Sequence, residues 1–101
     1  MFTPIRTIPL YDGFVYRYRF PNGYGASVAR HRNSYGGADK LWEVAVIRYD
    51  GPNDNDWDFD QSDILGDNPI DNLNDQQKEN ALMAISQLED PTPTLTRLGF
   101  F

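Results

Sequence analysis

Aromatic and non-aromatic residues alternate strictly along the segment FVYRYRF, which begins at Phe14. The aromatic rings fall on one side, and two arginines fall on the other. This period of two predicts a β-strand with one buried face. In the PNG segment that follows, Pro21 and Gly23 suit a short hairpin loop, and YGASVARH then resumes the strand pattern. We therefore predict an antiparallel hairpin over residues 14–31.

A second apolar segment, LWEVAVIRY, covers residues 41–49. It is apolar on both faces and rich in β-branched and aromatic residues, which is typical of a central strand covered on both sides. The acidic segment DGPNDNDWDFDQSD, residues 50–63, follows directly. We predict that this segment is an acidic loop or an edge strand.

The segment NDQQKENALMAISQLE repeats apolar residues at the spacing of an amphipathic helix. Asn74 is a suitable N-cap, and Gln77, three residues later, can complete a capping box. The prolines that follow Asp90 stop the helix. We predict a helix over residues 75–89 that covers one face of the sheet with these apolar residues: Ala81, Leu82, Ile85 and Leu88.

Taken together, the elements predict a single α+β domain that spans residues 1–101. Its sheet is a meander of three to four antiparallel strands, with one C-terminal helix packed on one face. Residues 1–13, which contain two prolines, are predicted to form an extended N-terminal arm. Residues 91–101 are predicted to form an extended tail.

The composition excludes several classes of site. The chain has no cysteine, so disulfides, thiolate metal sites and cysteine nucleophiles are excluded. No apolar run is long enough to cross a bilayer, and the proline-interrupted start does not resemble a signal peptide. We expect a soluble, intracellular protein.

The net charge of −6 is distributed unevenly. Residues 1–48 contain seven Arg or Lys and three acidic residues, whereas residues 49–101 contain two Arg or Lys and twelve acidic residues. Such polarity indicates an interaction surface of one sign. The alternative is that the two halves pack together and neutralise each other.

The acidic segment does not have the pattern of a calcium loop. An EF-hand needs Gly at position 6 and a bidentate acid at position 12. Starting at Asp54 those positions are Phe59 and Leu65, and starting at Asp56 position 6 is Gln61. We therefore predict no metal site and no cofactor.

The spacing of the acids suggests a contact surface. If residues 54–60 are extended, four Asp side chains point one way and could imitate the phosphates of a nucleic acid, while Trp57 and Phe59 face inward. A charged edge strand that prevents aggregation is the alternative. The predicted partner-binding residues are Asp54, Asp56, Asp58, Asp60, Asp63 and Asp67.

The basic hairpin is the alternative site, as a nucleic-acid-binding surface. The alternation argues against it, because it places the aromatic rings toward the core and the arginines toward solvent. Its candidate residues are Arg17, Arg19, Arg30 and Arg32. His31 is the only histidine, and no nucleophile, phosphate-loop or dinucleotide motif is present. We therefore expect no enzymatic activity.

The arrangement PNGYGASVARHRNSYGGADKLWEVAVI, followed by an acidic segment, DILG and a helix, resembles small bacteriophage-encoded proteins of uncharacterised activity. The resemblance covers residues 21–88. It implies a phage-type accessory protein that acts in the host cytoplasm by binding a host protein, with no catalytic residues to carry over. Inhibition of a nucleic-acid-binding or defence complex through the acidic surface is the function we expect. A nucleic-acid-binding module, and an assembly protein that dimerises through its edge strand or its Phe100–Phe101 tail, are the alternatives.

Overall fold

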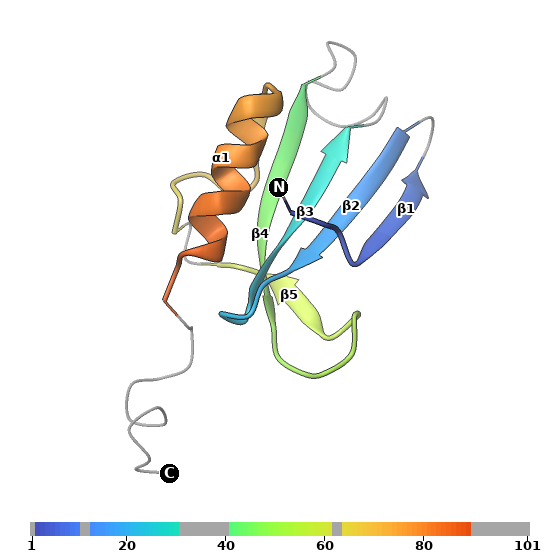
Figure 1. Ribbon diagram of the computed structural model, residues 1–101, viewed down its shortest axis with the longest axis vertical. Helices are drawn as coiled ribbons and strands as arrows, with labels where there is room; N and C mark the ends of the chain where they lie inside the picture. Colours follow the sequence, from blue (N-terminus) through green and yellow to red (C-terminus); the bar gives the residue numbers. More distant parts are fainter. Residues whose placement is uncertain (1, 11–12, 31–40, 62–63, 90–101) are drawn as a thin grey trace.

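The computed structural model describes residues 2–10, 13–30, 41–61 and 64–89. It is an α+β fold in which one antiparallel sheet carries a C-terminal helix (Figure 1). The elements in chain order are β1 (Arg6–Leu10), β2 (Gly13–Arg19), β3 (Tyr24–Arg30), β4 (Trp42–Tyr49), β5 (Trp57–Phe59), β6 (Ile70–Leu73) and α1 (Asp75–Ser86).

The sheet confirms the antiparallel meander but has six strands, so the predicted three to four was too few. The strand order is β1-β2-β3-β4-β5, and β6 also pairs with β4. β1 lies within the predicted N-terminal arm and pairs with β2, with Arg6 opposite Arg17. Its Pro9 is compatible with a strand because β1 is at the edge of the sheet. The predicted hairpin and central strand are β2–β3 and β4.

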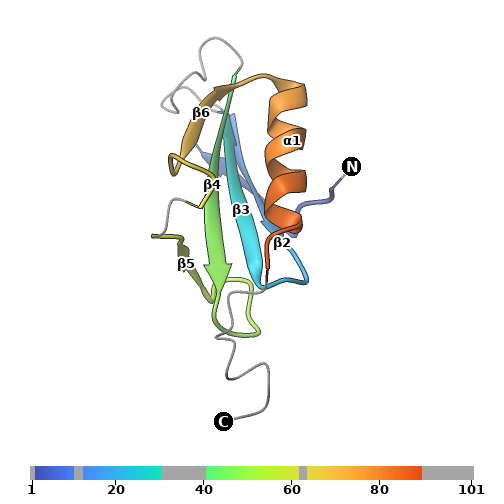
Figure 2. The same ribbon diagram turned by 90° about the vertical axis from the view of Figure 1, so that its left-hand side faces the viewer.

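One face of the sheet forms the core beneath α1 (Figure 2). The alternation in β2 is confirmed in part: Tyr18 and Phe20 are buried in this core, but Phe14 is 46% exposed, and Val15 on the opposite face is buried. α1 contributes Leu82 and Ile85, both fully buried, which is the predicted apolar stripe. The other core residues come from β3 and β4: Tyr24, Ala26, Val28, Trp42, Val44 and Val46.

The ends of α1 are fixed by side chains. The capping box is present: Asn74 Oδ1 accepts from the Gln77 N–H, and Gln77 Oε1 accepts from the Asn74 N–H, each at 2.8 Å. At the other end, Asn22 of the hairpin loop donates to the carbonyls of Ile85 and Leu88, at 2.8 and 3.0 Å. The helix ends at Ser86 rather than at 89, and its last carbonyls accept from Asn22 and from the Gln87 and Leu88 N–H groups.

Several predicted features lie outside the described residues: the loop before β4, the tail 91–101 with its Phe100–Phe101 pair, Arg32 and Asp63. In the described part of the chain, α1 has 12 residues and is too short and too polar to cross a bilayer.

Candidate functional site

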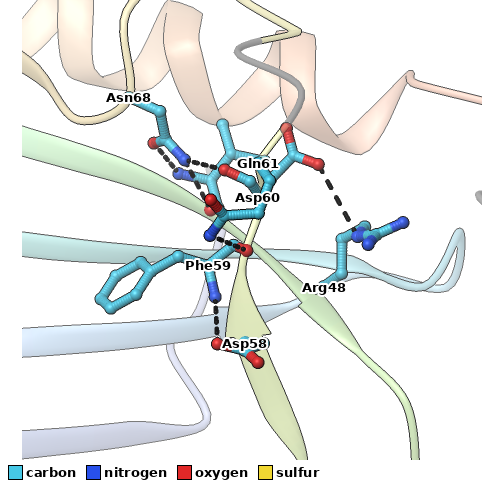
Figure 3. Close-up of polar contacts among 7 residues, drawn as sticks. Arg48, Asp58, Phe59, Asp60, Gln61 and Asn68 are labelled. Atoms are coloured by element: carbon cyan, nitrogen blue, oxygen red, sulfur yellow. Dashed lines mark hydrogen bonds and ion pairs between the residues drawn. The ribbon is translucent and has the colours of Figure 1, made fainter.

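The edge of β4 is shared by two short strands that lie end to end. β5 pairs with the C-terminal end of β4, and β6 pairs with its N-terminal end. The Asn68 side chain fills the gap opposite Val46. Figure 3 shows this side chain beside Asp60. Its Oδ1 accepts from the Val46 N–H at 2.8 Å, and its Nδ2 donates to the carbonyls of Val46 and Asp60 at 3.1 and 2.9 Å. One side chain therefore replaces a missing rung of the β-ladder.

Asp60 directly follows β5 and has a structural role. Its residue is only 4% exposed, and its N–H donates to the Val46 carbonyl at 3.0 Å. Its carboxylate lies 3.7 Å from Arg48 Nε (Figure 3). A buried carboxylate is tolerated only when it is paired and hydrogen-bonded. Asp60 is therefore not available to a partner.

The expected row of four carboxylates is not formed, because the extended stretch is limited to Trp57–Phe59. Asp54 lies in a turn. Asp56 folds back, and its Oδ2 accepts from the Asn53 N–H at 3.0 Å. Asp58 is exposed and Asp60 is buried, while Asp67 is exposed in the loop between β5 and β6.

The edge nevertheless has a high density of negative charge. Residues 49–77 contain nine Asp and no Lys or Arg. Five of these Asp side chains are exposed and form no ion pair with any described residue: Asp50, Asp54, Asp58, Asp67 and Asp71. We call these five residues the acidic edge. The acidic edge includes three of the predicted site residues and adds Asp50 and Asp71, which sequence reasoning left out.

The backbone of β5 is capped on its outer side at Phe59. Asp58 and Asp60 are the residues that hydrogen-bond to β4, so the N–H and C=O of Phe59 point away from it. The Phe59 N–H donates to Asp58 Oδ1 at 3.1 Å, and its C=O accepts from Gln61 Nε2 at 3.3 Å. These two caps satisfy the outward groups of Phe59, but not those of Trp57, the other residue of β5 whose N–H and C=O point away from β4.

The helix-free face of the sheet carries rings and guanidinium groups together. Arg17 lies over Trp57, with its Cζ 4.4 Å from the ring centroid, and Arg19 lies 4.3 Å from the Tyr49 centroid. Arg19 also donates to the Gly51 carbonyl at 2.7 Å, which holds the start of the acidic loop. The Trp57 and Phe59 pair was expected to face inward. Trp57 is half-buried beneath Arg17, but Phe59 is 47% exposed.

Burial on this face shifts two ionisation equilibria. Arg17 Nε and Tyr49 Oη are buried and have no hydrogen-bond partner in the described chain. Burial lowers the pKa of Arg17, and it raises the pKa of Tyr49 above its usual value. Gly25 makes room for the Tyr49 ring, since a Cβ there would lie 2.7 Å from Tyr49 Cε2.

The arginines of the basic hairpin do not share one surface. Arg17 and Arg19 lie on the helix-free face, whereas Arg30 is opposite Phe14 and belongs to the helix face. The Arg30 Cζ is 4.2 Å from the Trp42 ring centroid, and its Nη1 is 3.9 Å from Asp75. The alternative site is therefore divided between two faces of the sheet.

The described residues contain no group of three or more His, Cys, Asp or Glu that could hold a metal ion. Comparisons with protein-family models, with curated proteins and with solved structures find no match to this chain. The resemblance to phage proteins therefore stays a prediction.

Proposed function

We propose that this protein is a non-enzymatic binding protein that engages a basic partner protein through the acidic edge. In the setting that the phage resemblance implies, the partner is a host protein, such as a subunit of a nucleic-acid-binding or defence complex. The observation that carries this proposal is the set of five exposed Asp side chains, none of which has an ion-pair partner in the described chain.

Like charges along one edge oppose folding, since they repel one another in the compact state. Protection of a strand edge against aggregation explains only some of these acidic residues. Asp58 caps the backbone of β5, but Asp50, Asp54 and Asp67 lie in loops and protect no strand. A surface of one sign raises the rate and the selectivity of association with a surface of the opposite sign. Binding a basic partner gives these loop acids a role that folding does not.

Affinity capture from lysate, at low and at moderate salt, tests the proposal. The test variant changes Asp54, Asp58, Asp67 and Asp71 to Asn, which keeps side-chain shape and the oxygen that caps Phe59. Glu89→Gln, at an exposed position beyond α1, is the matched control. We expect the wild type and the control to capture the same protein in a salt-sensitive manner, and the fourfold variant to lose it. Equal capture by all three would contradict the proposal.

The two alternatives have less support. Nucleic-acid binding by the hairpin needs Arg17, Arg19 and Arg30 on one continuous surface, and they are divided between the two faces. Dimerisation by pairing of β5 edges is opposed by the caps on Phe59. A gel shift with labelled single strands at low salt, and light scattering on the eluted protein, measure these two alternatives directly.

A further inference from the structure

A notch of about 370 Å³ opens between β5 and the loop that leads to β6. It is lined by Phe59, Asp60, Gln61, Asn68 and Pro69. Phe59 and Pro69 give it apolar surface, and the polar side chains around them are held in place by the contacts described above. The two residues just before Phe59 and Asn68 are Asp58 and Asp67, both in the acidic edge.

We propose that the partner inserts an arginine side chain into this notch, with its guanidinium group on the Phe59 ring and with Asp58 and Asp67 supplying the opposite charge. This inference rests on the proposed function and names the chemistry of the partner. It also goes beyond charge alone, because it assigns the central contact to an uncharged residue.

The pattern of ring contacts points to arginine. In the described structure, Tyr49, Trp57 and Trp42 each have an Arg guanidinium group between 4.2 and 4.4 Å from the ring centroid. Phe59 packs edge-on against Trp57, with the centroids 5.2 Å apart and the planes at 84°. Phe59 has no cation over its ring among the described residues, and it is 47% exposed. An incoming guanidinium would give Phe59 the contact that its neighbours already have.

The hydrogen bonds that the backbone of β5 already forms restrict how the partner can bind. The outward N–H and C=O of Phe59 are already used by Asp58 and Gln61. A partner strand would have to displace both caps before it could pair with β5. The partner is therefore expected to bind through side chains. Arginine suits this mode better than lysine, because its planar group stacks on a ring and forms paired hydrogen bonds to carboxylates.

Titration with two blocked peptides tests the inference. The probes are acetyl-(Gly-Arg)5-amide and acetyl-(Gly-Lys)5-amide, which have equal charge, followed at low salt by nitrogen-15 NMR of the full chain. We expect the arginine peptide to bind about threefold more tightly than the lysine peptide. It should shift the side-chain amide signals of Gln61 and Asn68. In Phe59→Leu this preference should disappear, whereas Phe14→Leu, at an equally exposed phenylalanine (46%), should keep it.

The outcomes separate this inference from the proposed function. If both peptides bind equally to the wild type and to Phe59→Leu, and only the fourfold Asp→Asn variant loses them, the arginine notch is wrong and the acidic edge stands. Shifts confined to residues away from Gln61 and Asn68, or no shifts at all, also overturn the notch. The lysate capture then decides the acidic-edge proposal independently.

Discussion

The two faces of the sheet use aromatic rings in different ways. On the helix face, Tyr18 and Phe20 are buried under α1 as part of an apolar core. On the helix-free face, Tyr49 and Trp57 are covered by the guanidinium groups of arginines from β2. A helix covers several side chains at once, whereas each arginine covers one ring. The second arrangement therefore leaves a ring at its margin, Phe59, available for contact.

The same difference separates stability from binding. Burial of apolar surface stabilises the folded state in proportion to the area buried, and it is the main force that drives folding. Buried side chains should therefore determine the free energy of unfolding, both beneath α1 and at Ile47, which is fully buried on the helix-free face, while changes at the arginine cover and the β5–β6 edge should affect it less. Substitutions on the two faces and at the edge test this division.

The largest effect is expected in the core beneath α1. Leu82→Ala should lower the free energy of unfolding by about 2–5 kcal/mol, because it leaves a cavity around a side chain that is fully buried. The neighbouring Met83→Ala, at a side chain 48% exposed, should change it by less than about 0.5 kcal/mol. Urea denaturation measures both. Similar losses for the two variants would contradict the burial of Leu82 in the core.

A smaller loss is expected at the junction of β5 and β6. Asn68→Ala removes three hydrogen bonds and leaves the Val46 N–H without its partner, so the free energy of unfolding should fall by about 1–3 kcal/mol. Asn68→Asp keeps an acceptor for the Val46 N–H but cannot donate. Its loss of unfolding free energy should lie between zero and that of Asn68→Ala. Hydrogen exchange at Val46 should accelerate more in the Ala variant than in the Asp variant. Unchanged exchange in both would show that Asn68 does not complete the ladder.

The arginine cover should contribute less again. Arg17→Lys keeps the charge but loses the planar group over Trp57, and it should lower the free energy of unfolding by about 0.5–1 kcal/mol. The NMR signal of the Trp57 indole N–H should shift in this variant. Arg6→Lys, at an exposed arginine with no ring contact in the described chain, is the control and should leave that signal in place. If both variants behave alike, the stacking contributes nothing measurable.

The smallest effect near neutral pH is expected for Tyr49→Phe. It removes a buried hydroxyl with no hydrogen-bond partner in the described residues, so stability at pH 7 should stay the same or rise slightly. Burial raises the pKa of Tyr49, and also that of Tyr18, in the folded state. The unfolded chain therefore loses these protons first, and stability should fall as pH rises above about 10.

Thermal denaturation between pH 7 and 11 checks the alkaline behaviour. Tyr49→Phe should show a shallower alkaline loss than the wild type, because one of the two shifted tyrosines is gone. An equally steep loss in the variant would remove Tyr49 as a cause.

Local patterns were sufficient to predict the hairpin, the central strand and the helix. The alternation after Phe14 and the Asn74–Gln77 capping pair act over a few residues, and the structure confirms the strand and the capping box that they predict. β1 and β6 were missed, and β5 was given only as one of two alternatives, because these strands are short and contain Pro, Asp or Asn, which disfavour strands. Their conformation comes from pairing with β2 and β4, which a local pattern does not reveal.

The candidate site was predictable in charge but not in geometry. The excess of Asp between β4 and α1 is visible in the sequence, and it marks the acidic edge. The contact of Arg17 with Trp57 joins residues forty positions apart, and it depends on how β5 lies along β4. The role of Asn68 depends likewise on a gap between two strands.

Carboxylate-to-amine cross-linking of the captured complex tests the central claim most directly. A zero-length carbodiimide reagent joins Asp or Glu of this protein to partner lysines in contact with them, and mass spectrometry of the digested product locates the joined residues. We predict cross-links at Asp54, Asp58, Asp67 and Asp71, with none at Glu79 or Glu89. Cross-links concentrated at Glu79 and Glu89, with the acidic edge left unmodified, would contradict the account.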